Sequence, residues 1–478
     1  MRDLKRSRSG RMILASSRWR WRRRWGDDID MEALPKEKGV FWRATVTSAL
    51  LGAWFFLVYG TCNWITSKRE DVGTWYFEWE KLIPFVPEFV VPYYSLDLFF
   101  VGAFFLCRSR REMWTLSKRV FVVIVASGIC FLLFPLQLGM DRPMPDGGWT
   151  VPLFKLLHAQ DLPYNLAPSL HISLRSIFWV TYGRHLRGWV RSVTKIWFIL
   201  IGVSTLLVWQ HHFMDVVTGF LMGWLVMALI PDRETQPGPL GWMGKVTPRH
   251  RQLAGRYGLA GLLFGLLALP GGAFLWFGWP AIALGVVGLS YATANPRWMQ
   301  KSSGTLSPAS EWMLLPMMLV TQGWQRRWMK REMGSGEVDE NVWFGRRPDG
   351  KRAEHLLKAG CVAVLDLTAE FNAPVRLRER VVYRNLGWLD LTHPSVEDLK
   401  EAVAFIEEQR DRGMVYVHCQ LGLMRSASVA AAWLIHSGEV ASVEEAVGRI
   451  RELEPMAVLH GDALDALEQL HREKADKS

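Results

Sequence analysis

The chain has 478 residues, half of them apolar, and a formal net charge of +11. This composition, with 25 Trp residues, argues against an ordinary soluble protein and favours several membrane spans with indole rings at the membrane–water interfaces. Five scattered cysteines, an odd number, argue against a disulfide framework.

Residues 1–30 hold ten basic and four acidic side chains, so this segment carries +6 of the net charge. The stretch "RWRWRRRW" is compatible with nucleic-acid binding, but we prefer a cytoplasmic juxtamembrane tail (residues 1–40) attracted to anionic lipid, with no nucleic-acid partner. No cleavable signal peptide is expected, because "RMILASS" has too short an apolar core. A true start at Met31 is left open.

Apolar segments of about 20 residues, the length that crosses a bilayer, follow one another after the tail. Six of them form a predicted membrane domain, residues 41–232, and two more lie in residues 233–330. A further stretch, 306–323, contains Glu311 and Pro316 and is interpreted as interfacial or re-entrant. In chain order the eight expected spans are 43–62, 88–107, 120–139, 171–186, 193–210, 213–230, 257–276 and 278–294.

The loops between these segments differ in charge. Loops 107–119, 183–195 and 233–256 are basic, whereas 63–87 and 140–170 are mixed or acidic. The positive-inside rule then places the basic loops and both chain ends in the cytoplasm, and residues 140–170 and 211 outside. The sequence predicts an integral membrane protein of the bacterial inner-membrane type.

Residues 331–478 have the pattern of a soluble α/β domain. "NVWFG", "CVAVLDLT" and "MVYVHC" are expected to be strands, and "VVYRNLGWLDL" a strand with its exit loop. Helices are expected from the N-cap Ser395 to Gly413 and over "SASVAAAWLIHSG". Alternating strands and helices favour a largely parallel sheet covered by helices.

The loop after "MVYVHC" carries the strongest chemical signal. Cys419 and Arg425 are separated by five residues and lie between a buried strand and a helix start, where backbone N–H groups form an anion site that favours a thiolate nucleophile. The planar fork of Arg425 can hold two phosphate oxygens, and Ser426 can assist the departing thiolate. The loop residues expected to bind phosphate are Gln420, Leu421, Gly422, Leu423 and Met424.

The stretch from His418 to Ser426 resembles the protein tyrosine phosphatase signature His-Cys-x-x-Gly-x-x-Arg-Ser/Thr, and the compact domain resembles the dual-specificity branch. The resemblance implies a general acid on an upstream loop, where "GWLDLTHPS" supplies Asp390; a turn-capping aspartate is the alternative. Asp366 and Asp398 are weaker candidates. His418 is expected to tune the loop rather than transfer protons. The loop has no Lys, which argues against a polyphosphorylated substrate.

Ionisable residues in the membrane half point to a second site. His211 and Asp215 are four residues apart, so on a helix the carboxylate can orient the imidazole. This suits a histidine nucleophile that attacks phosphorus, with His171 as the acid for the leaving group. The alternative is a polar network that holds helices together.

These residues are similar to the type 2 phosphatidic acid phosphatase superfamily, whose motifs run Lys-x6-Arg-Pro, Pro-Ser-Gly-His and Ser-Arg-x5-His-x3-Asp. The chain departs from them at Pro135, Leu170 and Thr205, which replace Lys, Gly and Arg. The departures resemble the branch of the inositol-phosphoceramide synthases, which implies transfer of a phospho-headgroup from a lipid to an alcohol. The residues at motif positions are Arg142, Ser169, His171, Ser204, His211 and Asp215; His158, His185 and His212 fit none and are interpreted as interfacial.

The predicted fold is therefore a polytopic α-helical membrane domain of about eight spans, with a six-helix core, followed by an α/β dual-specificity phosphatase domain. The predicted function is a bifunctional membrane enzyme that acts on a lipid substrate, with a histidine site outside, a cysteine phosphatase inside and no metal or cofactor. A membrane-anchored protein phosphatase whose membrane half senses lipid, or two independent phosphatases, are the alternatives. The lipid, the acceptor alcohol and the oligomeric state are left open.

Overall fold

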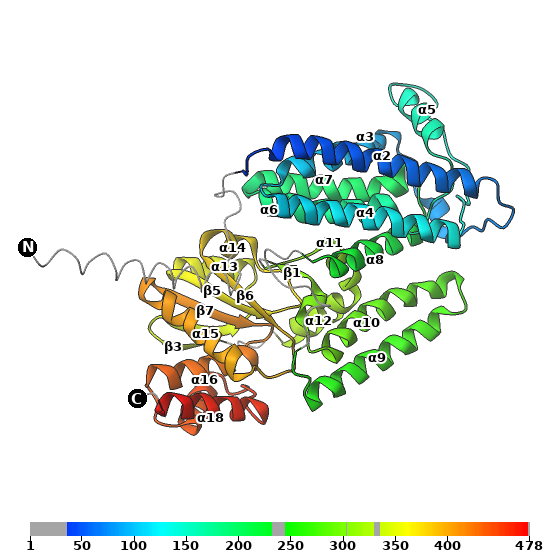
Figure 1. Cartoon of the computed structure of the whole chain (residues 1–478). Coiled ribbons are helices and arrows are strands. Elements are labelled where there is room, and N and C mark those ends of the chain that lie inside the picture. The colour runs from blue at the N-terminus through cyan, green and yellow to red at the C-terminus, as the bar shows by residue number, and fades with distance from the viewer. Residues whose placement is uncertain (1–35, 232–243, 303, 329–334, 477–478) are drawn as a thin grey trace, which may run out of the picture. The chain divides into compact units, whose positions relative to one another are not determined.

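The computed structural model describes residues 36–231, 244–302, 304–328 and 335–476. The chain divides into two compact units, Met1–Gly241 and Trp242–Ser478 (Figure 1). The boundary expected near residue 331 therefore falls inside the second unit. The basic tail and the alternative start at Met31 lie outside the described residues.

The first unit is helical. Its long helices are α2 (Val40–Thr66), α3 (Val90–Leu106), α4 (Arg110–Leu133), α6 (Leu170–His185), α7 (Gly188–Leu207) and α8 (Phe213–Leu229); a shorter α5 (Val151–Gln160) and the 3-10 turns η1 (Glu78–Leu82) and η2 (Pro87–Phe89) lie between them. Helix α4 begins earlier than the span expected there, because Ser109 caps it by accepting a hydrogen bond from the Glu112 amide (3.1 Å). Residues 110–119 are therefore helical, although the sequence placed them in a loop.

Among the described residues, five helices are long and apolar enough to cross a membrane: Val40–Thr66, Pro87–Leu106, Arg110–Leu133, Gly188–Leu207 and Gly272–Ala292. Phe213–Leu229 is apolar but shorter. The six segments expected to span in the first unit all contain a helix, and the total of eight spans stays a prediction.

Helices α6 and α8 approach each other closely. The Ser173 hydroxyl donates to the carbonyl of Gly219 (2.9 Å), and the Ser169 amide donates to the carbonyl of Asp215 (3.0 Å). A Cβ atom on Gly219 would lie only 2.7 Å from the Ser169 carbonyl oxygen, so glycine permits this contact. The packing brings the first turn of α8, with Asp215, beside the start of α6, with His171.

The second unit starts with a helical hairpin, α9 (Pro248–Ala268) and α10 (Gly278–Ala292), joined through the 3-10 turn η4 (Gly272–Phe277) (Figure 1). After it come η5 (Pro296–Met299), a two-stranded ribbon of β1 (Lys301–Ser302) and β2 (Thr305–Leu306), and helices α11 (Pro308–Met313) and α12 (Leu315–Trp328). The interfacial stretch expected at 306–323 is thus largely helical.

A five-stranded sheet follows, with strand order β3-β4-β7-β5-β6. Strands β4 (Val342–Arg346), β5 (Cys361–Thr368), β6 (Val382–Trp388) and β7 (Met414–Cys419) are parallel, which confirms the strands expected from the sequence. Strand β3 (Ser335–Asp339) adds an antiparallel edge that was not expected, because "SGEVD" has no apolar run.

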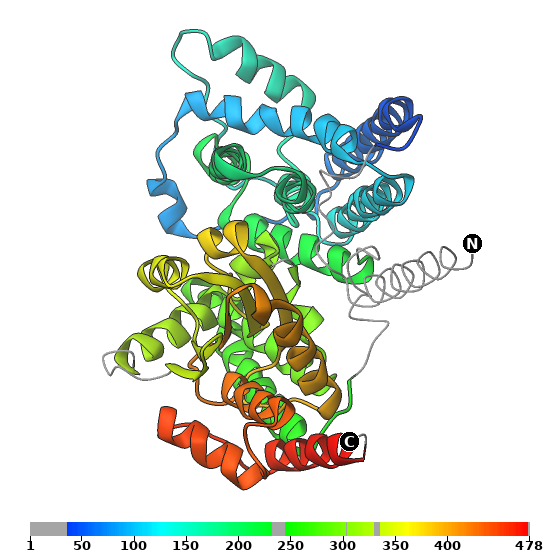
Figure 2. The same ribbon diagram turned by 90° about the vertical axis from the view of Figure 1, so that its left-hand side faces the viewer.

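Helices cover both faces of this sheet (Figures 1 and 2). One face packs on α15 (Val396–Gln409), α16 (Arg425–Ser437), α17 (Val443–Leu453) and α18 (Asp462–Ala475), and the other on α13 (Gly350–Lys358) and α14 (Val375–Arg380). As predicted, Ser395 caps α15, in a capping box with Asp398, and the short turn η6 (Arg410–Arg412) leads to Gly413. The β7–α16 connection thereby lies at the carboxyl edge of the parallel strands.

Candidate active site

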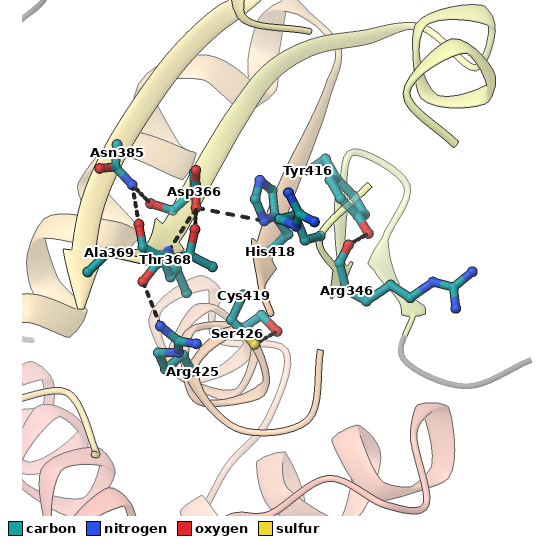
Figure 3. Close-up of polar contacts among 12 residues, drawn as sticks. Arg346, Asp366, Thr368, Ala369, Asn385, Tyr416, His418, Cys419, Arg425 and Ser426 are labelled. Atoms are coloured by element: carbon teal, nitrogen blue, oxygen red, sulfur yellow. Dashed lines mark hydrogen bonds and ion pairs between the residues drawn. The ribbon is translucent and has the colours of Figure 1, made fainter. Parts of the chain in front are cut away.

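Cys419 is the last residue of β7, the central strand, whose six residues are all buried. The loop turns at Gly422, which has φ of +85°. The Gly422 amide donates to the Cys419 Sγ (3.3 Å). The Ser426 Oγ lies 3.3 Å from the same sulfur (Figure 3). A backbone N–H group and a hydroxyl therefore lie next to the Cys419 sulfur.

Neighbouring segments hold the rest of the loop. The Gln420 carbonyl accepts from the Arg347 amide (3.3 Å), and the Leu423 carbonyl accepts from the Val458 amide (2.7 Å). Gln420 is buried, whereas Leu421 is exposed at the loop tip. The loop is therefore tied down on both sides of Gly422.

Arg425 is fully buried at the start of α16 and gathers oxygen atoms from two other segments. Its Nη1 donates to the Trp388 carbonyl (2.8 Å), and its Nη2 to Asp390 Oδ1 (2.8 Å) and Glu370 Oε1 (2.9 Å). Burial opposes the charge of Arg425, but the two carboxylates outweigh it and raise the pKa of the guanidinium. The structure thus brings the predicted Asp390 and Arg425 together.

Glu370 is a residue that the sequence analysis did not single out. Its carboxylate is almost wholly buried beside Arg425, and one of its oxygens accepts the Ala369 amide (2.9 Å). Its position in the sequence could have revealed it. Glu370 directly follows β5, and because the parallel strands β5 and β7 end at the same edge of the sheet, residues after β5 lie near Cys419.

A second buried cluster lies behind the loop. The Lys301 ammonium, 2% exposed, donates to Asp366 Oδ2 (2.7 Å), to the Thr368 carbonyl (2.7 Å) and to the Thr368 hydroxyl (2.9 Å). Burial alone would raise the pKa of Asp366, yet Lys301 lowers it well below its usual range. Asp366 is therefore committed to this ion pair, and Asp398 to the α15 cap, so that of the three candidate aspartates Asp390 is the one that contacts Arg425.

His418 precedes the nucleophile and is fully buried, with Nδ1 3.8 Å from Asp366 Oδ1 (Figure 3). Burial lowers its pKa to about 4, against the opposing effect of Asp366. A neutral imidazole at pH 7 agrees with the expected tuning role.

The second unit is similar to known proteins. Residues 342–470 match the family model "Dual specificity phosphatase, catalytic domain". The human protein "Phosphatidylglycerophosphatase and protein-tyrosine phosphatase 1" is 34% identical over 146 residues, which are 28% of this chain and 72% of that protein. The chain belongs to the dual specificity phosphatase family. The resemblance of the His418–Ser426 stretch to that branch is confirmed.

Other members of the family match more distantly. The Arabidopsis thaliana "Phosphatidylglycerophosphate phosphatase PTPMT2" is 28% identical over 144 residues, 28% of this chain and 62% of that protein, so the chain spans less than two thirds of its length. The crystal structure of "Tk-PTP in the active form" shares 30% identity over 29% of this chain and 97% of that one, with a TM-score of 0.27. The likeness of the first unit to type 2 phosphatidic acid phosphatases stays a prediction.

In the first unit, the structure brings three of the predicted residues together where α6 and α8 begin. The His211 Nδ1 lies 3.4 Å from Asp215 Oδ2, and both side chains are buried. The His171 ring stacks on Tyr93 at 4.3 Å and lies within electrostatic range of His211. A histidine oriented by a carboxylate and a second imidazole are thus close together.

The other motif positions make different contacts. The Ser204 hydroxyl donates to Ile201 in its own helix (2.7 Å), and the Ser169 hydroxyl caps α6. Arg142 donates to the Asp161 carbonyl (2.6 Å) and to the side chain of Gln210. Ser204, Ser169 and Arg142 therefore all hydrogen-bond to other groups of the protein.

His212 and His185 are both buried within the protein, and their expected position at the membrane interface stays a prediction. The His212 Nε2 accepts the Gly139 amide (3.0 Å), so its Nδ1 carries the proton and donates to Glu80 (3.2 Å). His185 pairs with Glu112 at 2.6 Å. His158 is half-buried. No sequence pattern pointed to Glu80, which lies in the segment between the first two expected spans.

Proposed function

We propose that this protein is an integral membrane phosphatase that hydrolyses a phosphate monoester on a lipid headgroup at Cys419. The observation that carries the proposal is that Arg425 closes the loop that starts at Cys419 and donates to Asp390, which lies on the segment after β6. The apolar helices of the chain and the names of two relatives, which specify phosphatidylglycerophosphate, support a lipid substrate.

The mechanism follows from the contacts of these side chains. The Cys419 thiolate attacks phosphorus while Arg425 and the loop amides hold the phosphate oxygens, and Asp390 gives its proton to the departing ester oxygen. Water then attacks the phosphocysteine, Asp390 takes a proton from that water, and the sulfur–phosphorus bond breaks. The Ser426 hydroxyl donates a hydrogen bond to the thiolate as inorganic phosphate forms. The Asp390 side chain is 44% exposed, so it can leave Arg425 when phosphate enters.

Phosphate release by the full chain in mixed micelles tests this proposal. Phosphatidylglycerophosphate and a phosphotyrosine peptide are compared for wild type, Cys419→Ser and Ser426→Ala. We expect faster release from the lipid, loss of release in Cys419→Ser, and accumulation of the phosphocysteine in Ser426→Ala. Faster release from the peptide would favour the alternative of a membrane-anchored protein phosphatase.

A second activity is proposed for the membrane half, on the group of His171, His211 and Asp215. His211 would attack the phosphorus of a lipid, oriented by Asp215, and His171 would protonate the leaving group. In the proposed topology this site faces outside and both chain ends face the cytoplasm, in a membrane of the bacterial inner-membrane type. The basic tail would lie on anionic lipid.

Lipid profiles of cells that express Cys419→Ser, His211→Ala and the double variant test whether the two sites act in sequence. A phosphorylated lipid that accumulates in Cys419→Ser and disappears in the double variant supports a two-step synthase. Accumulation of phosphatidate or an isoprenoid diphosphate in His211→Ala alone supports two independent phosphatases.

The proposed steps use cysteine and histidine nucleophiles and involve no metal ion. We therefore expect phosphate release from the lipid to persist after extensive treatment with a chelator, measured against untreated enzyme. A strict requirement for added Mg²⁺ would contradict the proposed chemistry at both sites.

A further inference from the structure

The helical hairpin of α9 and α10 is closely packed and apolar on its outer surface. A Cβ atom on Gly288 would lie 3.3 Å from the Gly258 amide, so the backbones nearly touch. Helix α9 is about 30 Å long; its first half is basic, so it is not among the described helices apolar enough to span, and its apolar surface lies in its second half. Leucines 259, 262, 263, 266 and 267 are exposed along it, and the region Gly272–Ala292 is apolar enough to span.

The open end of this hairpin meets the segment that carries Asp390. Tyr291, in the last turn of α10, donates its hydroxyl to the Asp390 carbonyl (2.8 Å). Arg249, in the first turn of α9, donates from Nε to the Leu391 carbonyl (3.3 Å). Two consecutive carbonyls are therefore held by the two arms of one hairpin.

The backbone at this point needs such support. Leu391 has φ of +56°, a region that L-residues with side chains rarely adopt. On the other side of Asp390, the Trp388 carbonyl is held by Arg425. The segment 388–391 is thus fixed at one end by the phosphate-binding loop and at the other end by the hairpin.

We propose that Tyr291 and Arg249 are positioning residues for the general acid, and that the α9–α10 hairpin, embedded in lipid, sets Asp390 at the bilayer surface. The inference rests on the proposed function and deepens it. The substrate would be a phosphate monoester on a lipid headgroup, whose leaving oxygen meets Asp390 at the membrane–water boundary. Residues 248–292 lie outside the part of the chain that matches the family model, so this arrangement is an addition to the phosphatase domain.

The test is the dependence of kcat on the leaving group, measured with a series of aryl phosphates on the full chain in detergent. General acid catalysis matters most for poor leaving groups. Tyr291→Phe removes the hydroxyl and keeps the ring, and we expect kcat for phenyl phosphate to fall roughly three- to tenfold, the effect of one lost hydrogen bond. With a nitrophenyl phosphate the loss should be smaller. Arg249→Gln should likewise lower kcat more for phenyl phosphate than for a nitrophenyl phosphate.

Tyr257→Phe is the matched control. The Tyr257 ring stacks on Tyr291 at 5.4 Å, but its hydroxyl makes no hydrogen bond to the described residues. This variant should retain the leaving-group dependence of wild type. If Tyr291→Phe and Arg249→Gln also retain it, while Asp390→Asn steepens it and Cys419→Ser is inactive, the positioning role is overturned and the proposed function stands. If Cys419→Ser retains activity, the proposed function itself fails.

Hydrolysis in vesicles tests whether Asp390 lies at the bilayer surface. Wild type is reconstituted in phosphatidylcholine vesicles that contain phosphatidylglycerophosphate, and hydrolysis is compared with that of soluble glycerol 3-phosphate at equal phosphate concentration. We expect faster hydrolysis of the lipid. Equal or faster hydrolysis of the soluble ester would overturn the placement of Asp390 at the bilayer surface.

Discussion

Lys301 neutralises the buried negative charge of Asp366 in the phosphatase sheet. Asp366 is fully buried, and the Lys301 ammonium is its cationic partner at 2.7 Å. Loss of one partner of a buried ion pair destabilises proteins by about 3–5 kcal/mol. We therefore expect Lys301→Met to lower the apparent Tm of the second unit clearly. Lys358→Met removes a charge at an exposed position of α13 and should change it little; equal shifts in the two variants would contradict this role.

His418 makes the stability of the phosphatase domain dependent on pH. Its pKa is about 4 in the folded state, because the ring is buried, and about 6.5 when unfolded. Between these values the unfolded chain binds a proton that the folded chain does not, so stability falls as the pH is lowered from 6.5 to 4. We expect the apparent Tm to fall over this range, and to fall less in His418→Gln. Parallel profiles for the two proteins would contradict this assignment.

Residues joined by a local motif could be predicted from the sequence, and residues joined only by folding could not. The spacing of Cys419 and Arg425 already defines the loop. The Arg425–Glu370 and Lys301–Asp366 contacts instead join residues 55 and 65 positions apart, and no sequence period links them. Burial of a lysine in particular opposes its usual preference for the surface, so only the folded structure could reveal it.

At the level of elements, the loop between β7 and α16 depends on one glycine. Gly422 has φ of +85°, and its amide contacts the Cys419 sulfur. Gly422→Ala should strain the loop by about 1–2 kcal/mol and lower kcat/KM for an aryl phosphate roughly tenfold. The control is Gly448→Ala in α17, where a Cβ atom meets nothing within 4 Å; it should retain full activity. Equal activity of the two variants would show that the loop does not require this conformation.

The elements themselves were predicted unequally well. Buried parallel strands such as β5 and β7 are continuous apolar runs, so the sequence identifies them. The start of α4 could not be placed, because its first turns are basic and the capping contact of Ser109 decides the boundary. Strand β3 was missed for a similar reason, since its pairing with β4 stabilises a polar segment.

For the whole molecule, the sequence placed the domain boundary by composition, near residue 331, whereas the second unit begins at Trp242. Residues 331–478 expressed alone would lack Lys301 and the ribbon whose Leu306 amide bonds to Asn372. We expect residues 242–478 in detergent to resist proteolysis and hydrolyse an aryl phosphate, and residues 331–478 to be cleaved rapidly. Equal resistance of the two fragments would contradict this.

The Lys301–Asp366 pair also constrains how such a protein can be inherited. A phosphatase domain cut from this chain at the family boundary and joined by recombination to another anchor would carry Asp366 without its cation. The segment that carries Lys301 and the phosphatase domain must therefore be inherited together. If they separate, the residue at position 366 must change. In homologues that lack the 301–306 ribbon, we expect position 366 to be uncharged or to have a new basic neighbour, and a survey of their sequences would reveal it.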